Sequence, residues 1–350
     1  MGGFFFKEGF SRDFVELALK LAGNSADSVV LDPFLGVGTT CLTCRELGLE
    51  SVGVEVSPLF AMVSRVKTND YESMELRAVR DKILGQKFER RELDVSGFIR
   101  RLFPRPVLED LVFFREKLWE IEDRGVREFF ALALMNAAGK TSYIFRDGGM
   151  IKIKRDLPRP PSLKKTFRRV VNTMIRDVER HPLSPSTATI ILGDARRMNF
   201  LESETFDIVI TSPPYLNKIE YTSVYRPEYE LFMKDLAFNP IRSYIGLRPS
   251  DAMEEISGGL PPAAQYYFRD MRAALAEIFR VLKPGGSSVM VAGGGVFPDR
   301  VLEVDIHISE IASDLGFKVE RIIAVNKRVA TTRRVIKIGM SRESILVFRK

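Results

Sequence analysis

The sequence predicts an α/β fold with a mostly parallel sheet, interrupted by a basic and largely helical insertion. Residues 29–31 are apolar and mostly β-branched, as in a strand buried on both faces, and they run into a glycine turn and a helix. Residues 52–56 form a second strand of this kind that carries a carboxylate near its end. The alternation of strand and helix stops after Thr68 and resumes at Thr187, so both flanks of the insertion build one sheet.

The turn after the first strand indicates a nucleoside site. It comprises Pro33, Phe34, Gly36, Gly38, Thr39 and Thr40. Asp32 precedes it and would repel a pyrophosphate, and no Gly-Lys-Ser/Thr follows, so the turn is not a phosphate loop. An acid here favours a cationic or zwitterionic nucleoside such as S-adenosylmethionine (SAM). Glu55 is expected where a ribose diol binds in such sheets. The alternative is a generic nucleotide fold, because glycine turns are common.

Residues 32–40 read D-P-F-L-G-V-G-T-T and resemble the D-P-F-x-G-x-G-T-T motif of SAM-dependent amino-methyltransferases of nucleic acids. The resemblance implies a Rossmann-like class I SAM methyltransferase fold, with a mostly parallel seven-stranded sheet flanked by helices. It implies S-adenosyl-L-methionine as the cofactor, and contact between Asp194 and its adenine. The competing interpretation of Asp194 is a helix N-cap. Val56 and Ala195 complete the predicted cofactor site.

The remaining elements follow from periodicity and from turn residues. Ser11 is expected to cap a first helix, and Ser57-Pro58 to start another. Helices are predicted in the insertion at 74–86, 107–118, 127–138 and 162–180, and after it at 273–282 and 304–315. Strands are predicted at 187–192, 206–210, 287–292, 318–325 and 343–348. We expect a catalytic domain over 1–69 and 186–350, a basic insertion for substrate recognition over 70–185, and a smaller substrate-side insertion over 216–264.

The segment Ser212-Pro213-Pro214-Tyr215 is the candidate catalytic motif, because it follows a strand at the ligand edge of the sheet. The Ser212 hydroxyl and the Pro213 carbonyl are assigned as acceptors for the N–H groups of an exocyclic amine, which would localise the nitrogen lone pair for methyl transfer. Pro214 stiffens the backbone, and Tyr215 offers a face on which a base could stack. The alternative is a proline turn that ends a strand and has no catalytic role.

This motif resembles the S-P-P-Y amino-methyltransferases, most of which are cytosine-N4 enzymes. Adenine-N6 enzymes and the glutamine methyltransferases of release factors resemble it too, but they usually carry Asp or Asn where this chain has Ser212. No Pro-Cys dipeptide occurs, which argues against the thiolate mechanism of cytosine-C5 enzymes.

The positive charge is concentrated in two segments. Residues 140–180 contain twelve Lys or Arg and four acids, and residues 321–350 contain nine and one, in a chain of net charge +7. This pattern predicts a polyanion partner, although two solvated surfaces would give the same pattern. The residues predicted to bind nucleic acid are Lys152, Lys154, Arg155, Lys164, Lys165, Arg168 and Arg169.

The insertion precedes Asp194 and shows no sequence-reading module, so we favour a structured RNA recognised by shape and phosphates. The core of this chain also resembles that of an archaeal cytidine-N4 methyltransferase of ribosomal RNA, which implies an RNA substrate. A DNA cytosine-N4 methyltransferase of a modification system is the alternative, and a SAM-binding nucleic-acid module without catalysis is a third hypothesis.

No apolar run approaches the ~20 residues that span a bilayer, and the first residues do not resemble a signal peptide, so we expect no membrane partner and a cytoplasmic location. The cysteines are Cys41 and Cys44, and with two His in the chain zinc is not expected. Both are predicted to be small buried residues, and no metal is expected.

Overall fold

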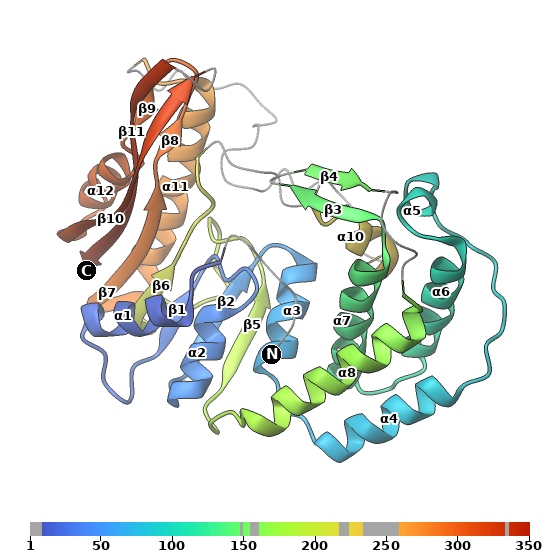
Figure 1. The fold of residues 1–350 in the computed structure, drawn as a ribbon. Helices are drawn as coiled ribbons and strands as arrows, with labels where there is room; N and C mark the ends of the chain where they lie inside the picture. The colour runs from blue at the N-terminus through green and yellow to red at the C-terminus, as the bar shows by residue number, and fades with distance from the viewer. Residues whose placement is uncertain (1–8, 148–149, 155–160, 217–223, 234–258, 333–335) are drawn as a thin grey trace. The chain divides into compact units, whose positions relative to one another are not determined.

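The computed structural model describes residues 9–147, 150–154, 161–216, 224–233, 259–332 and 336–350 (Figure 1). These residues form two compact units. One contains residues Arg65–Leu183 together with residues 224–233, and the other contains Glu8–Ser64, Ser184–Lys218 and Ile241–Lys350 as far as they are described. The second unit holds the sheet, and the first is mainly helical.

The sheet has seven strands in the order β10-β11-β7-β6-β1-β2-β5. Their bounds are β1 (Val30–Asp32), β2 (Ser51–Glu55), β5 (Ala188–Leu192), β6 (Phe206–Thr211), β7 (Leu282–Gly293), β10 (Lys318–Thr332) and β11 (Ile336–Arg349). Neighbours from β5 to β7 pair in parallel, and β11 runs antiparallel to both β7 and β10. The predicted α/β class with a mostly parallel seven-stranded sheet is therefore confirmed.

Helices pack on both faces of this sheet. On one face, α1 (Arg12–Ala22) and α2 (Thr39–Leu47) share a core with Ile208 and Val289. On the other, α11 (Pro262–Val281) and α12 (Val304–Asp314) pack against Val209 and Met290. Successive strand residues thus alternate between two cores, as expected for strands covered on both sides. Figure 1 shows the two helical layers.

Strand β1 marks the point at which the strand order reverses. The chain passes from β1 to β2 and then β5 on one side, and afterwards continues to β6 and β7 on the other side. Ligands of open α/β sheets bind beyond the carboxyl ends of the strands at such a switch point. The loops after β1 and β6 are therefore neighbours at the edge where a cofactor is expected.

The helical unit is built around three long helices, α6 (Arg105–Trp119), α7 (Arg124–Thr141) and α8 (Leu163–Arg180). Their buried faces carry Phe113, Phe130 and Phe167, among other apolar residues. The unit also contains α4 (Ser73–Gly85), α5 (Gly97–Leu102), α10 (Arg226–Phe232) and a hairpin of β3 (Ile144–Asp147) and β4 (Met150–Ile153). The helices predicted in the insertion are present, each within a few residues of its expected bounds.

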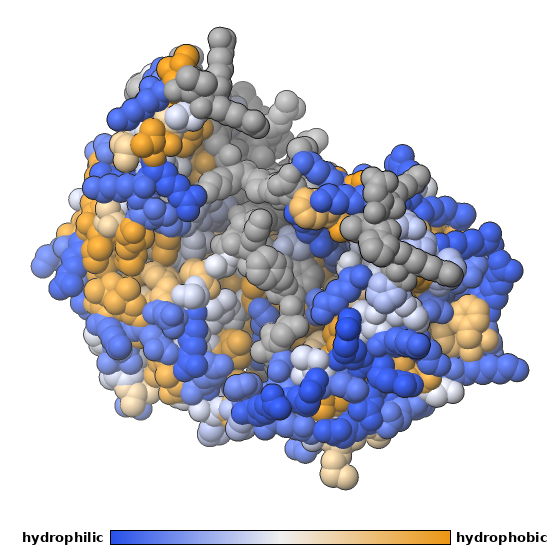
Figure 2. Space-filling view, viewed as in Figure 1, coloured by the Kyte–Doolittle hydropathy of each residue, from blue (hydrophilic) through white to orange (hydrophobic). Residues whose placement is uncertain are grey.

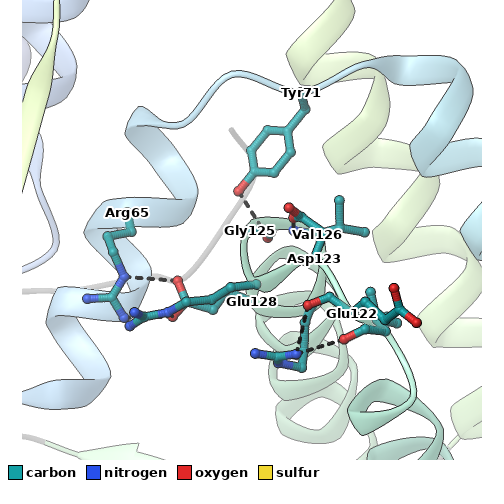
Figure 3. Close-up of polar contacts among 10 residues, drawn as sticks. Arg65, Tyr71, Glu122, Asp123, Gly125, Val126 and Glu128 are labelled. Carbon is teal, nitrogen blue, oxygen red and sulfur yellow. Dashed lines mark hydrogen bonds and ion pairs between the residues drawn. The ribbon is translucent and has the colours of Figure 1, made fainter.

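Polar contacts fix the start of α7 (Figure 3). The Asp123 side chain caps the helix. Glu128, one turn further on, accepts from Arg65 at 2.7 Å, and the Tyr71 hydroxyl donates to the carbonyl of Gly125. Helix α3 (Pro58–Thr68) contains the boundary between the two units, and Arg65 belongs to the helical one. These contacts hold the first residues of that unit against α7.

Some predicted bounds were wrong. Strands β10 and β11 continue well beyond the expected 318–325 and 343–348, and α11 begins at Pro262 rather than at residue 273. The polar residues that follow Val325 hid the longer strand, because alternation of apolar residues fails in a hairpin that is exposed on both faces. A second small hairpin of β8 (Gly295–Val296) and β9 (Val301–Leu302) follows β7.

Cys41 and Cys44 are buried on α2, as predicted. Within the described ranges, no cluster of three or more His, Cys, Asp or Glu side chains is arranged to hold a metal ion. Across those same ranges, no helix combines the length and the hydropathy needed to cross a membrane.

Candidate active site

Asp32 lies at the centre of the site, as the last residue of β1. Its carboxylate accepts from the Thr40 hydroxyl at 2.5 Å, the Thr211 hydroxyl at 2.7 Å and the Phe34 N–H at 3.1 Å. Thr40 belongs to α2, and Thr211 ends β6 immediately before Ser212. One buried carboxylate therefore joins the glycine turn to the candidate catalytic motif.

Glu55 ends β2 and holds the other side of the turn. One of its oxygens accepts from the Gly36 N–H and the other from the Ser57 N–H, each at 2.8 Å. Each carboxylate oxygen has a further lone pair for a second donor such as a ribose hydroxyl. Burial raises the pKa of Glu55 to about 7 and that of Asp32 to about 6. A positively charged ligand would stabilise the ionised form of these two buried carboxyl groups.

The glycine turn is packed so closely that a side chain does not fit at Gly38. Its φ is +85°, and an added Cβ would lie 2.8 Å from Oγ and 3.0 Å from Cα of Ser64. The Ser64 hydroxyl donates to the Gly36 carbonyl at 3.0 Å, which ties the turn to α3. Gly38 precedes α2 directly, as predicted, and Thr39 is the first residue of that helix.

The structure brings the predicted cofactor residues to one edge of the sheet. The loop after β1 holds Pro33, Phe34, Gly36 and Gly38, α2 opens with Thr39 and Thr40, Val56 follows β2, and Asp194 and Ala195 follow β5. The Gly193 N–H donates to the Glu55 carbonyl at 3.0 Å, so the ends of β2 and β5 are adjacent. The roles of these residues toward a cofactor remain predictions.

Asp194 does not cap a helix, so that alternative was wrong. Its carboxylate accepts from the N–H of Arg196 at 2.9 Å and from its guanidinium at 2.6 Å, within a turn. Arg196 also bonds Asp270 at 3.1 Å. Contact between Asp194 and an adenine remains a prediction. If it forms, the Asp194 carboxylate would bind both the adenine and Arg196.

Ser212, Pro213, Pro214 and Tyr215 follow β6, next to the turn after β1. The Tyr215 hydroxyl donates to the carboxylate of Glu343 on β11 and is also hydrogen-bonded with Ser212. The Tyr215 ring lies against the backbone of Gly293, where an added Cβ would approach Cδ2 to 2.4 Å. The Tyr215 side chain is thus held by the Glu343 carboxylate at its hydroxyl and by the backbone of Gly293 against its ring.

Sequence reasoning missed three residues of this site: Thr211, Gly293 and Glu343. Thr211 adjoins the quoted motif, and its hydroxyl could have been noticed there. Gly293 opens a run of three glycines after a predicted strand, a signal of close backbone approach. Nothing in the sequence identifies Glu343, because its role depends on the pairing of β11 with β7.

The predicted nucleic-acid-binding residues lie on two elements of the helical unit. Lys152 and Lys154 are exposed at β4, and Lys165, Arg168 and Arg169 are exposed at the start of α8, with Lys164 half-buried. Arg155 lies outside the described residues. Figure 2 shows that the visible surface over α8 is mainly hydrophilic. Their binding role remains a prediction.

The residues present fit SAM by the chemistry of their donors and by the shape of the turn. Two buried acids suit the positive charge and the ribose hydroxyls, and the turn after β1 excludes a side chain at Gly38. With the sheet order described above, they define the class of the protein. It is a SAM-dependent methyltransferase with a Rossmann-like fold.

Comparisons with known proteins give matches to both sequences and solved structures. A family model described as DNA methylase, N6_N4_Mtase, matches residues 6–64. Type II methyltransferase M.BsoBI of Geobacillus stearothermophilus is 24% identical, over 92% of this chain and 79% of its own length. Type II methyltransferase M.AvaI of a Nostoc species is also 24% identical, over 92% and 80%. The TehB-like SAM-dependent methyltransferase of Corynebacterium glutamicum gives a TM-score of 0.36 at 12% identity, covering 96% of this chain and 87% of that one.

The chain is therefore similar to the N6/N4 amino-methyltransferases of nucleic acids. The resemblance stated from the two motifs is confirmed, with SAM as the cofactor. The preference for RNA finds no support, since the matching family model is one of DNA methylases.

Proposed function

We propose that the protein transfers a methyl group from SAM to the N4 amino group of cytosine in DNA. The observation that carries this proposal is the bond of Asp32 to both Thr40 and Thr211, which holds the cofactor turn beside the S-P-P-Y motif. The description of the matching family model favours DNA over the RNA first expected. Ser212 favours cytosine-N4, since related adenine enzymes usually carry Asp or Asn at that position.

An exocyclic amine of a base is a poor nucleophile, because its lone pair is delocalised into the ring. In this proposal the Ser212 hydroxyl oxygen and the Pro213 carbonyl accept the two N–H groups and localise that pair on nitrogen. Ser212 can donate its own proton to Tyr215, so its lone pairs stay available to the amine. When bound, SAM would supply an electrophilic methyl group, whose transfer breaks the methyl–sulfur bond, leaves a neutral thioether and requires the amine to lose one proton to solvent. Orientation and fixed dipoles then account for most of the rate.

The Tyr215 ring is the proposed stacking surface for the cytosine. Its hydroxyl is engaged by Glu343 and its ring is seated on Gly293, so the ring is preorganised before a base arrives. The target base has to leave the duplex to reach such a pocket. The basic residues of β4 and α8 are proposed to bind phosphates, as part of a recognition role for residues 70–185.

The test is an incubation of the protein with methyl-labelled SAM and mixed-sequence DNA, and in parallel with total RNA, followed by nucleoside analysis. We expect label in N4-methylcytosine from DNA. Label confined to RNA would contradict the DNA substrate, and label in N6-methyladenine would contradict the cytosine assignment.

The non-catalytic hypothesis is separated by the same experiment. A SAM-binding module would retain SAM, measured by calorimetry, yet leave both nucleic acids unlabelled. The Ser212→Ala variant serves as the control, because it keeps the fold of the turn while it removes the proposed acceptor.

A further inference from the structure

The hairpin of β10 and β11 extends beyond the rest of the sheet at the candidate catalytic edge. The last residue of β7, Gly293, pairs with Glu343, and Glu343 pairs with Asn326. From Lys327 outward, β10 and β11 pair with each other and with no third strand of the described sheet. We call this two-stranded part, residues 327–332 and 336–342, the ribbon.

Three cations of the ribbon form no ion pair with an acid in the described part of the chain. Lys327, Arg328 and Lys337 are exposed, and among the described residues none of them bonds an acid. Of the other described cations of residues 321–350, Arg342 bonds Asp305 at 2.6 Å, Arg349 bonds Glu320 at 3.3 Å and Lys350 bonds Glu204 at 3.4 Å. Arg321, near the start of β10, is exposed and forms no ion pair with a described acid. Most of the described cations of this segment that lack an ion pair with a described acid therefore lie on the ribbon.

The ribbon is held rigidly at its base. The Gly294 N–H donates to the Arg342 carbonyl at 2.8 Å, and Ser344 and Arg342 both bond the buried carboxylate of Asp305 at 2.6 Å. Further out, Gly339 lies against Val301 of β9 so closely that an added Cβ would be 2.9 Å from Cγ2. A surface braced in this way loses little conformational entropy when it binds a partner.

The ribbon is joined directly to the candidate catalytic motif. Glu343 accepts the hydroxyl of Tyr215, and Asn326, its cross-strand partner, is two residues from Arg328. Side chains at i and i+2 share a face of a strand and lie about 7 Å apart along it. Arg328 thus projects on the same face as Glu343, one step further from the sheet.

We propose that the ribbon is a docking arm for the DNA duplex that carries the target base. A two-stranded ribbon fits the ~12 Å width of the major groove. Lys327, Arg328 and Lys337 would contact phosphates, while the exposed Val329 and Met340, paired across the ribbon, would contact sugars or thymine methyl groups. Figure 2 shows hydrophilic and hydrophobic residues interspersed toward this end of the hairpin. The inference rests on the proposed function, because it takes DNA as the substrate.

The test compares two double variants of β10 with equal loss of charge. Lys327→Ala/Arg328→Ala changes the ribbon, and Lys318→Ala/Arg321→Ala changes exposed cations at the opposite end of the same strand. Binding of a short fluorescent DNA duplex is followed by anisotropy at several salt concentrations. For the ribbon variant we expect an affinity about tenfold lower and a salt slope smaller by about 1.8, that is about 0.9 for each of two phosphate contacts. The control variant should bind as the unchanged protein does.

Equal losses in both variants, or no loss in either, would overturn the proposal, as would tighter binding of structured RNA that depends on Lys327 and Arg328. A shift of the ribbon variant from dimer to monomer with unchanged DNA affinity would instead assign the surface to a second copy of the chain. SAM affinity, measured by calorimetry, should be equal in all three proteins and so verifies their fold. Because binding is measured without methyl transfer, loss of the ribbon proposal and loss of the proposed function are separate outcomes.

Discussion

The hydroxyl of Thr211 donates a hydrogen bond to the carboxylate of Asp32 over 2.7 Å, across the pair of parallel strands β6 and β1. The two residues are 179 positions apart in the sequence. Both precede loops that are proposed to act on the same methyl group, so this one bond sets the spacing between donor and acceptor loops.

Replacing Thr211 by Val should uncouple the two loops. Val has nearly the shape of Thr but removes one of the two donors to Oδ1 of the buried Asp32, which keeps the Phe34 N–H, at a cost of about 1–3 kcal/mol in the free energy of unfolding. Methyl transfer should slow more than SAM binding weakens, because the cofactor turn keeps Thr40. The comparison is with Thr40→Val, which should weaken SAM binding as well. Calorimetry measures the SAM affinity of each variant, and single-turnover kinetics measure its transfer rate. Equal losses of SAM affinity and of transfer rate in Thr211→Val would refute a coupling role for Thr211.

Ser212→Ala should lower the rate of methyl transfer by about 10²–10³-fold, the effect of removing one preorganised hydrogen-bonding group from a reaction centre. The SAM dissociation constant should change less than about twofold, since Asp32 and Glu55 are untouched. The measurement is single-turnover transfer at saturating SAM and DNA. A rate within a few-fold of the unchanged protein would show that Ser212 is not the acceptor.

Gly293→Ala should displace the ring of Tyr215, because the new Cβ would lie 2.4 Å from Cδ2 of that ring. We expect a fall in transfer rate of at least about tenfold, as when a reacting group is misplaced by about 1 Å. Gly139→Ala is the matched control, since a Cβ there meets nothing within 4 Å. The control should leave activity unchanged. If both variants retain full activity, the seating of Tyr215 on Gly293 does not matter for the reaction.

SAM should bind more weakly as the solution becomes acidic. Burial raises the pKa of Glu55 to about 7 and that of Asp32 to about 6, so both groups take up protons in the free protein well above their ordinary values. Above about pH 7 both are carboxylates that favour a cationic ligand, and as the pH falls toward about 5 they become neutral. The dissociation constant should therefore rise, with release of protons on binding near pH 6.5.

Calorimetry in buffers of different ionisation enthalpy measures that release. Glu55→Gln should bind SAM about tenfold or more weakly, because a charge-assisted acceptor is lost, and its affinity should depend less on pH. A dissociation constant that stays constant between about pH 5 and 8 in the unchanged protein would exclude titration of these two acids on binding.

Arg342→Ala should destabilise the sheet unit. Asp305 is 3% exposed and accepts from Arg342, from Ser344 and from the Ile306 N–H, so the variant leaves a buried carboxylate without its cationic partner. Loss of one partner of a buried ion pair costs on the order of 3 kcal/mol. Urea unfolding measures this cost, and Arg349→Ala, which removes a more exposed pair with Glu320, should cost less than about 1 kcal/mol. Equal urea midpoints for Arg342→Ala and Arg349→Ala would show that the buried ion pair of Arg342 with Asp305 does not stabilise the sheet unit more than the exposed pair does.

The local features of the site could be predicted because they depend on neighbours in the sequence. Asp32 and Glu55 end short apolar strands, Gly38 adopts a left-handed φ, and Ser212 follows a strand, all of which leave direct sequence signals. Parallel strands then bring their carboxyl ends to one edge, so the meeting of the two motifs follows from the fold class.

The contacts that complete the site could not be predicted in this way. Tyr215 and Glu343 are 128 positions apart, and they meet because β11 enters the sheet in one particular register. Asp194 resembled an N-cap because acids before polar residues often start helices, yet Arg196 takes its carboxylate within a turn. The length of β10 was underestimated because its backbone pairing continues where its side chains are polar.

Strand β10 is also an edge strand of the sheet that the described residues form, fifteen residues long, with Val325 and Val329 exposed. A flat edge of this kind recruits further strands and promotes aggregation. Irregularities between Val319 and Arg321, between Ala324 and Asn326, and between Ala330 and Thr331 bend it, and its lysines and arginines repel a second copy. Neutralising those cations should therefore lower the concentration at which the purified protein precipitates.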